Sequence, residues 1–326
     1  MSDEDRLASE PGIGRPHQVI PKIRIAAIVG PTAAGKTEAS LEVAEKLGAE
    51  IVSVDSMQIY KGMDIGTAKP PAATRERVRH HLVDEFDPSK DVTVAEFQSL
   101  ARAAIADIAA RKRIPLLVGG SGLYFKAVVD DLEFPPRSAE VRSALEEEAD
   151  ELGAEVLHER LRSLDPAAAS RMEPGNTRRI VRALEVIELT GRPFSDNDSW
   201  DRSTSLYAVA VAALKLPRDL LFERIGARVD RMLEEGLVEE TKRLEAQGLG
   251  RTARQALGYR QILEAGPEAS VNDIRDEIVR ATKRFARRQE SWFRADHRFQ
   301  WFDGANEEVV AELIGFFSGA IGAGSA

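Results

Sequence analysis

Residues 30–37 have the types and spacing of a phosphate-binding loop. They read GPTAAGKT and satisfy the pattern G-x-x-x-x-G-K-[ST], with an apolar segment before them and helical spacing after them. Backbone amides at the start of a helix attract phosphate oxygens, Lys36 adds a positive charge, and the Thr37 hydroxyl can ligate Mg²⁺. The predicted phosphate-binding residues are Gly30, Pro31, Thr32, Ala33, Ala34, Gly35, Lys36 and Thr37. The loop alone does not distinguish phosphoryl transfer from loss of a diphosphate leaving group.

Two further polar residues follow apolar, strand-like segments. Asp55 directly follows the run 49–54, and Ser121 lies in the turn Gly-Gly-Ser-Gly that follows the run 114–118. Ligands in parallel α/β sheets sit beyond the carboxyl ends of the strands, so Lys36, Asp55 and Ser121 are expected to share one crevice. Asp55 can serve as a base. A hydrogen bond to a magnesium-bound water, or an Asx turn, remains an alternative for Asp55, and a turn-stabilising hydroxyl remains one for Ser121.

The elements that position these residues alternate between strands and helices. Strand-like runs cover 22–29, 49–54, 114–118 and 207–216, and helical spacing covers 38–47 and 94–110. This order predicts an α/β fold, a P-loop NTPase-like parallel sheet core flanked by helices, with an inserted helical domain. The expected divisions are a tail at 1–22, a discontinuous core at 23–131 and 204–318, a helical insertion at 132–203, and a frayed tail at 319–326.

Composition narrows the class of protein. The chain has 326 residues, 43% of them hydrophobic and 30% charged, which is typical of a globular protein. It has no cysteine, so disulfides and thiolate metal sites are excluded, and this composition fits a cytoplasmic protein. No run approaches the roughly 18 apolar residues of a membrane span.

The net charge of −9 disfavours a nucleic-acid partner, but its distribution does not. Residues 280–298 carry seven basic side chains against Glu290 and Asp296. On a helix most of them occupy an arc of about 140°, next to an apolar stripe. This pattern favours a helix that docks on the core and presents cations to a phosphate backbone, with a merely solvated face as the alternative.

Several segments together resemble the tRNA dimethylallyltransferase family (tRNA isopentenyltransferase, bacterial type). They are 55–70 (DSMQIYKGMDIGTAKP), 80–84 (HHLVD), 118–124 (VGGSGLY), 178–186 (RRIVRALEV), 255–260 (QALGYR), 287–289 (RRQ) and 292–294 (WFR). They occur in order along most of the chain and are far more specific than the phosphate loop. Two departures are Ser121, where the family usually has threonine, and Arg79, where it often has proline.

The resemblance implies a reaction. A dimethylallyl group passes from its diphosphate to the exocyclic amine of the adenosine immediately 3′ of the anticodon in tRNA, diphosphate is released, and Mg²⁺ is the cofactor. The amine becomes acidic as its C–N bond forms, so a nearby carboxylate can take the proton. The catalytic candidates are Asp55, Ser121, Lys36 and Arg224, and the metal candidate is Thr37. Arg224 shares one face of the helix 220–237 with Arg228, and its alternative is a solvated ion pair.

The resemblance and the residue chemistry together give the RNA contacts. Residues 255–260 offer Gln and Arg for base edges and Tyr259 for stacking on an unpaired base. The predicted tRNA-binding residues are Asp55, Ser56, Met57, Gln58, Ser121, Arg142, Arg178, Arg179, Arg182, Gln255, Gly258, Tyr259, Arg260, Arg287 and Arg288. The resemblance also implies a monomer, without the cysteine-bearing zinc module of eukaryotic members.

Three other functions stay open at this stage. A nucleotide or small-molecule kinase explains the phosphate loop but gives no role to the basic helix. An adenylate isopentenyltransferase would act on a free nucleotide, whereas the insertion and the arginines favour a macromolecular acceptor. A non-enzymatic, NTP-dependent RNA-binding switch would not need Asp55.

Overall fold

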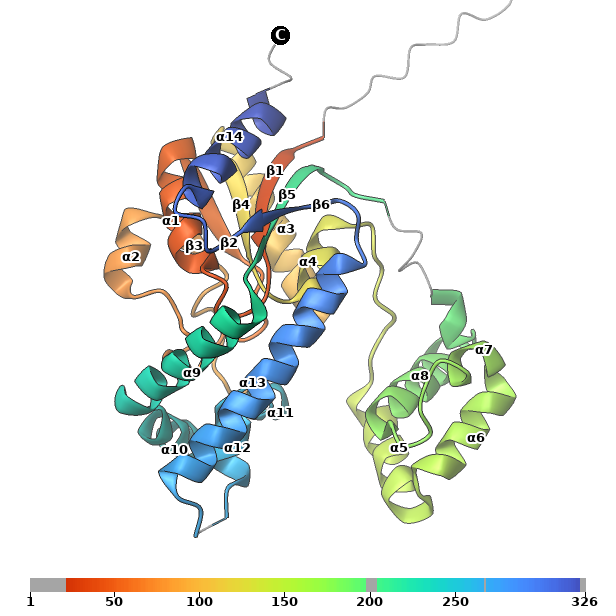
Figure 1. Cartoon of the computed structure of the whole chain (residues 1–326). Helices are drawn as coiled ribbons and strands as arrows, with labels where there is room; N and C mark the ends of the chain where they lie inside the picture. The colour runs from red at the N-terminus through yellow and green to blue at the C-terminus, as the bar shows by residue number, and fades with distance from the viewer. Residues whose placement is uncertain (1–21, 198–203, 267, 323–326) are drawn as a thin grey trace, which may run out of the picture.

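The computed structural model describes residues 22–197, 204–266 and 268–322. Figure 1 shows a core built around one sheet and a helical insertion beside it. The sheet has six parallel strands in the order β3-β2-β4-β1-β5-β6. The strands are β1 (Arg24–Val29), β2 (Ala49–Ser53), β3 (His80–His81), β4 (Ile114–Gly119), β5 (Ala208–Lys215) and β6 (Phe299–Asp303). The predicted parallel α/β core is therefore confirmed.

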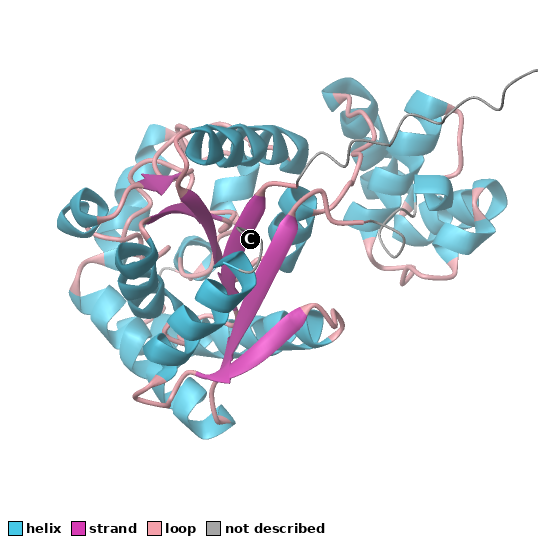
Figure 2. Cartoon of the chain, turned by 90° about the horizontal axis from the view of Figure 1, so that it is seen from above, coloured by secondary structure: helices cyan, strands magenta, loops and turns pink. Residues whose placement is uncertain are grey.

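The strands are apolar throughout because helices cover both faces of the sheet, as Figure 2 shows. In β1, Ile25, Ala27 and Val29 face the layer that contains α3 (Val94–Ala110), α4 (Gly122–Val129) and α13 (Val271–Arg294). Ala26 and Ile28 face α1 (Lys36–Leu47) and α14 (Val309–Gly322). The two-residue period of a strand thus divides one short run between two cores.

The helix expected at 94–110 is α3, which has these bounds because Thr93 and Glu96 form a capping box at its start. The edge strands β3 and β6 were not anticipated. β3 has only two residues, and β6 follows the basic helix without a turn signal of its own. A short helix, α2 (Ala72–Arg77), precedes β3.

The insertion has a core of its own. Its helices are α5 (Ala139–Leu152), α6 (Ala154–Leu164), α7 (Pro166–Ala169), α8 (Thr177–Thr190) and the 3₁₀ helix η1 (Phe194–Asn197). They pack around a separate cluster that includes Leu145, Leu161 and Leu184. The chain leaves and re-enters the core side by side, since the Asp131 N–H donates to Thr204 O at 3.0 Å. The expected boundary at 203 falls outside the described residues.

The C-terminal helices form a lobe below the sheet in Figure 1. They are α9 (Arg218–Glu234), α10 (Leu237–Gln247), α11 (Arg251–Arg254), α12 (Tyr259–Glu264) and the long α13. The capping box of Ser270 and Asp273 starts α13. Of the expected tails, 1–21 and 323–326 lie outside the described residues, whereas 319–322 belong to α14 rather than to a frayed end. In the described part of the chain, no helix is long and apolar enough to cross a membrane.

Candidate active site

The carboxyl ends of three neighbouring strands deliver the predicted chemical residues to one edge of the sheet. β1 leads into the phosphate loop 30–37, β2 into Asp55, and β4 into Ser121. Pairing of β4 with both β1 and β2 places these ends side by side. The convergence expected from the strand order is therefore present.

The phosphate loop has the backbone that its glycines predict. Gly30 has φ +143°, and a Cβ there would lie 2.6 Å from Leu214 O, so a larger residue does not fit. Gly35, at φ +88°, turns the chain into α1. The Lys36 ammonium donates to Pro31 O at 2.7 Å, which folds the lysine back over the loop. Helix α1 thus begins with its free amides directed at the crevice.

Burial, one arginine and two carboxylates act on the charge of Lys36. Burial, followed by the positive charge of Arg228, lowers the pKa of Lys36 to about 8, although the charges of Asp55 and Glu38 act in the opposite direction. Burial also lowers the pKa of Arg228 below its ordinary value. Two cations held close together and partly dehydrated favour a multivalent anion such as a diphosphate.

Both arginines of α9 reach the crevice. Arg224 lines a pocket of about 700 Å³ with Gly35, Lys36 and Thr37. Arg228 lines that pocket, a narrow space beside Asp55, and a third pocket of about 440 Å³. The site list drawn from the sequence contained Arg224 and omitted Arg228, although the four-residue spacing on one helix face was the signal that could have added it.

Asp55 makes an Asx turn and still faces the crevice. Its Oδ1 accepts hydrogen bonds from the Met57 N–H at 2.8 Å and the Gln58 N–H at 3.4 Å. Within the described residues, Oδ2 accepts no hydrogen bond, and Asp55 lines the 440 Å³ pocket with Ser121. The turn and the role of a base are therefore compatible, because they use different oxygens.

The 440 Å³ pocket gathers most of the residues predicted to meet the acceptor. Its lining includes Thr32, Asp55, Ser56, Met57, Ser121, Gln255, Gly258, Arg260 and Arg288. Ser121 is the N-cap residue just before α4, and its hydroxyl makes no capping hydrogen bond. Gln58 lies apart, since its side-chain amide accepts from the Ser53 hydroxyl and donates to Thr67 O. Gln58 therefore shapes the segment rather than offering its amide to a ligand.

Gln289 connects the two halves of the site, a role missed at the level of sequence although it stands in the motif Arg-Arg-Gln. Its Oε1 accepts from the Thr32 N–H at 2.9 Å, and its Nε2 donates to Gly120 O at 2.8 Å. The side chain is buried, at 8% exposure. One residue of α13 thus sets the spacing between the phosphate loop and the turn that carries Ser121.

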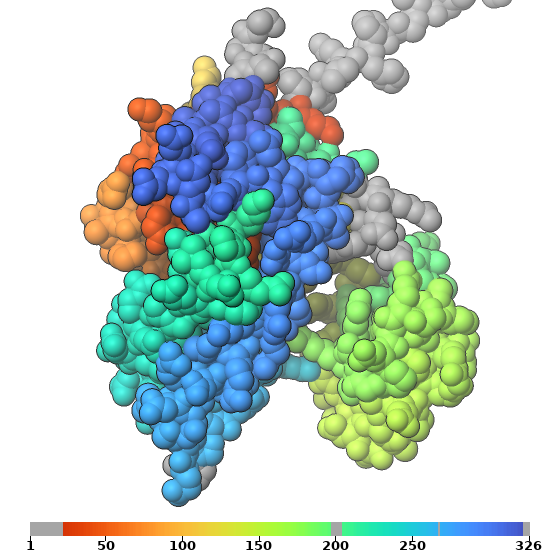
Figure 3. All heavy atoms as spheres, in the orientation of Figure 1, coloured from red at the N-terminus to blue at the C-terminus, as the bar shows by residue number. Residues whose placement is uncertain are grey.

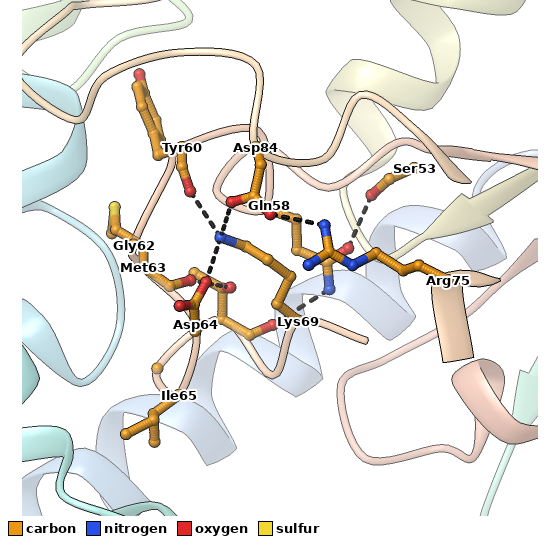
Figure 4. Close-up of polar contacts among 12 residues, drawn as sticks. Ser53, Gln58, Tyr60, Gly62, Met63, Asp64, Ile65, Lys69, Arg75 and Asp84 are labelled. Atoms are coloured by element: carbon orange, nitrogen blue, oxygen red, sulfur yellow. Dashed lines mark hydrogen bonds and ion pairs between the residues drawn. The ribbon is translucent and has the colours of Figure 1, made fainter. Parts of the chain in front are cut away.

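A buried lysine holds the segment that follows Asp55. Figure 4 shows the Lys69 ammonium donating to Asp64 at 2.7 Å, Asp84 at 2.6 Å and Tyr60 O at 2.8 Å. Arg75 adds an ion pair to Asp84 at 2.7 Å. Since Gly66 and Thr67 line the 440 Å³ pocket, this network supports one of its walls.

The prediction that Tyr259 stacks on an unpaired base is wrong. Its side chain is fully buried and therefore offers no face to an unpaired base. Its hydroxyl donates to Glu240 at 2.6 Å, and its ring fills the space beside Gly66, where a Cβ would lie 2.3 Å from the ring. Glu240 also accepts from the backbone N–H groups of Asp64 and Ile65, both at 3.1 Å. Tyr259 thus fastens the C-terminal lobe to the wall of the pocket.

The arginines of the insertion divide into two sets. Arg142 and Arg182 bind the fully buried Glu185, at 2.5 and 2.9 Å, so they stabilise the insertion. The spacing of three residues between Arg182 and Glu185 on α8 could have indicated their pair, whereas the contact of Arg142 on α5 with Glu185 depends on the packing of the two helices. Arg178 and Arg179 are exposed near the start of α8 and form no ion pair within the described residues.

The basic segment 280–298 is also divided. Arg287 and Arg288 are exposed on α13 and form no ion pair in the described part of the chain, whereas Arg280 and Arg284 pair with Glu277. Helix α13 ends at Arg294, and Arg298 beyond it binds the buried Asp130 at 2.5 Å. Arg298 therefore anchors the root of the insertion instead of extending the cationic face.

Together, the parallel sheet, the phosphate loop and the adjoining pocket define a P-loop α/β enzyme with room for a phosphate compound and a second substrate. Residues 58–296 match the family model described as IPP transferase. Curated relatives named tRNA dimethylallyltransferase include one from Streptomyces coelicolor, 52% identical over 87% of this chain and 91% of the relative. Another, from Salinispora arenicola, is 51% identical over 89% of this chain and 85% of the relative. The chain belongs to the tRNA dimethylallyltransferase family.

Solved structures agree with this assignment. The crystal structure of a full-length tRNA isopentenylpyrophosphate transferase from Bacillus halodurans is 39% identical, with a TM-score of 0.69 over 93% of this chain and 98% of that chain. A eukaryotic dimethylallyltransferase described as acting on tRNA is 26% identical, with a TM-score of 0.73 over 87% of this chain and 74% of that chain. These likenesses favour prenyl transfer to tRNA over the kinase and free-nucleotide alternatives.

Proposed function

We propose that this enzyme transfers a dimethylallyl group from dimethylallyl diphosphate to the exocyclic amine of the adenosine immediately 3′ of the anticodon in tRNA. One observation carries the proposal: Arg228 lines two large pockets and the narrow space between them, beside Lys36 and Asp55. A diphosphate on the phosphate loop and a base in the 440 Å³ pocket would meet at this point. Both substrates can thus be bound before the reaction.

The donor side suits a departing diphosphate. The C–O bond to the allylic carbon breaks, and negative charge collects on the diphosphate oxygens. Lys36, Arg224, Arg228 and the phosphate-loop amides would stabilise that charge. The bond breaks more readily because the cations are already in place before charge develops.

The residues present fit Mg²⁺ held mainly by the diphosphate and water. The Thr37 hydroxyl lies beside Lys36 in the donor pocket, and no group of three or more His, Cys, Asp or Glu residues in the described ranges could hold a metal ion. Mg²⁺ commonly binds in this way, through one protein oxygen, substrate phosphates and several waters. The ion would supply further neutralisation of the leaving group.

On the acceptor side, Asp55 would take the proton. The adenine amine forms a C–N bond to the allylic carbon, its nitrogen becomes positively charged, and one N–H proton passes to the Asp55 carboxylate. The Asx turn holds Oδ1, so Oδ2 is the oxygen directed to the amine. The Ser121 hydroxyl, on the opposite turn, would orient the adenine or a neighbouring phosphate.

The target base has to leave its stack to reach Asp55. Gln255, Arg260 and Arg288 at the pocket lining, with Arg287 beside them on α13, would receive the loop of the RNA. Arg178 and Arg179 of the insertion would contact its backbone. We further propose a monomer that acts on tRNA in the cytoplasm, consistent with the absence of cysteine from the sequence.

The test is an incubation with labelled dimethylallyl diphosphate, Mg²⁺ and unmodified tRNA whose anticodon is followed by adenosine. Asp55→Asn keeps the oxygen that accepts from Met57 but removes the base. We therefore expect label in the anticodon loop with wild type, and a transfer rate lowered about 100-fold or more with the variant. Asp107→Asn, an exposed carboxylate on α3, is the matched control. ATP without a prenyl donor tests the kinase alternative: ATP turnover without prenyl transfer would reject the proposal.

A further inference from the structure

A further pocket lies between the core and the insertion. It has a volume of about 630 Å³ and is lined from the core side by the start of α3 and by Leu123 of α4. The linker 132–137, the α7–α8 region and Phe194 line the other side. Figure 3 shows the insertion standing apart from α13 across a hollow. None of the residues assigned above to the chemical step lines this pocket, whereas Arg179, assigned above to the RNA backbone, does.

The lining of the pocket combines an apolar part, called its floor here, with a set of arginines, called its rim. Phe134, Pro135 and Pro136 supply the floor together with Leu123, which is 40% exposed. The rim residues are Arg137, Arg171, Arg179 and Arg182, and Glu133 is the acidic residue in the lining. Apolar faces that stack a base, next to cations that meet its phosphate, are the usual means of holding an unpaired nucleotide.

The arginines of the rim differ in whether a protein group already binds them. Arg182 donates to Pro135 O and Pro136 O, both at 2.9 Å, and pairs with Glu185, so it fixes the linker rather than a ligand. Arg137 and Arg179 have no carboxylate partner within the described residues. The pKa of Arg137 is lowered by burial and then by the nearby charges of Arg182 and Arg142, while Glu185 acts in the opposite direction.

This pocket is close to the reaction site. Leu123 lies two residues beyond Ser121, which lines the 440 Å³ pocket. Burial raises the pKa of Tyr124, the residue after Leu123, to about 12; the charges of Tyr60 and Asp55 raise it too, and those of Arg137 and Arg178 lower it. An RNA whose target base lies beside Asp55 would therefore bring other unpaired nucleotides of the same loop to the pocket between the core and the insertion.

We infer that the pocket between the core and the insertion binds a second unpaired base of the anticodon loop, distinct from the base that is modified. The base would stack on Phe134 and Leu123, and its phosphate would meet Arg137 and Arg179. The inference rests on the proposed function. The added contact makes catalysis depend on a nucleotide of the loop other than the target. Residues of both the insertion and the core would bind that nucleotide.

The experiment measures coupling between a protein change and an RNA change. Stem-loop RNAs carry one abasic nucleotide at each unpaired position in turn, except the target. Leu123→Glu places a charge in the pocket, and Phe134→Ala removes the stacking ring. Leu100→Glu, on an exposed face of α3, is the matched control because Leu100 has a similar exposure of 38%.

With wild type, we expect one abasic position to lower kcat/KM about tenfold or more, the effect of one lost base stack. Leu123→Glu and Phe134→Ala should show a similar loss with the intact RNA and little further loss at that position, while Leu100→Glu behaves like wild type. If the loss in kcat/KM from the protein change multiplies with the loss from the abasic nucleotide at every position, the two changes are independent and the inference is overturned. Failure of wild type to modify the intact stem-loop would instead reject the proposed function.

Discussion

Replacing Gln289 by leucine tests whether the spacing between the two halves of the site controls donor binding. The change keeps the approximate volume but leaves the Thr32 N–H and Gly120 C=O without their partners at 2.9 and 2.8 Å. A buried polar group left unpaired costs about 1–3 kcal/mol. Because both groups border a pocket that water can enter, we expect a total loss of about 2–4 kcal/mol in the free energy of unfolding.

Part of this loss should be seen in the affinity for the donor, since the Thr32 amide belongs to the phosphate loop. If about 2 kcal/mol is lost from binding, the Kd of dimethylallyl diphosphate rises about 30-fold. The assay is isothermal titration of the donor, with thermal denaturation to follow stability. Gln289→Glu keeps the acceptor for Thr32 and loses the donor to Gly120, so it should fall between wild type and leucine.

Gln98→Leu is the matched control. Gln98 also bridges two backbone carbonyls, those of Ala127 and Leu132, but it does not touch the phosphate loop. Its replacement should lower stability without changing donor affinity. A Gln289→Leu protein that binds the donor as tightly as wild type, with unchanged stability, would refute the reasoning.

Three other predictions concern charge and burial. Because Lys36 binds anions only when protonated and its pKa is about 8, donor affinity should fall as pH rises above 8, by up to about tenfold per unit, and Lys36→Met should abolish this slope. Hydrogen bonds from Arg111 and then His81 lower the pKa of Glu50 from 4.5 to about 2. The ionised Glu50 therefore contributes about 3 kcal/mol to the free energy of unfolding above pH 4.5, and this contribution is lost as pH falls toward 2. The Glu50→Gln protein should therefore lose less stability than wild type between pH 4.5 and pH 2, and an acid-denaturation curve identical to that of wild type would contradict this prediction. Tyr259→Phe should cost about 1–2 kcal/mol in unfolding free energy through the lost bond to Glu240, and an unchanged thermal stability would contradict the role given to that bond.

Patterns within short segments predicted much of the fold and site. The strand before the phosphate loop, the bounds of α3 and the convergence of Lys36, Asp55 and Ser121 follow from local signals and from the geometry of parallel strands. The edge strands β3 and β6 did not, because one is very short and the other is defined by its pairing with β5. Periodicity identifies the faces of one element but not the partner that each face meets.

The sequence by itself determined the parallel α/β class, the phosphate loop, the family and most of the residues around the pocket, because each depends on neighbouring residues or on ordered motifs. The tertiary structure alone decided which polar side chains are free to act. Tyr259 and Arg298 look available in the sequence, yet Glu240 and Asp130, distant along the chain, take up their polar groups. Gln289 acquires its role only where α13 meets two loops. Burial and long-range pairing depend on packing between elements, which no local pattern records.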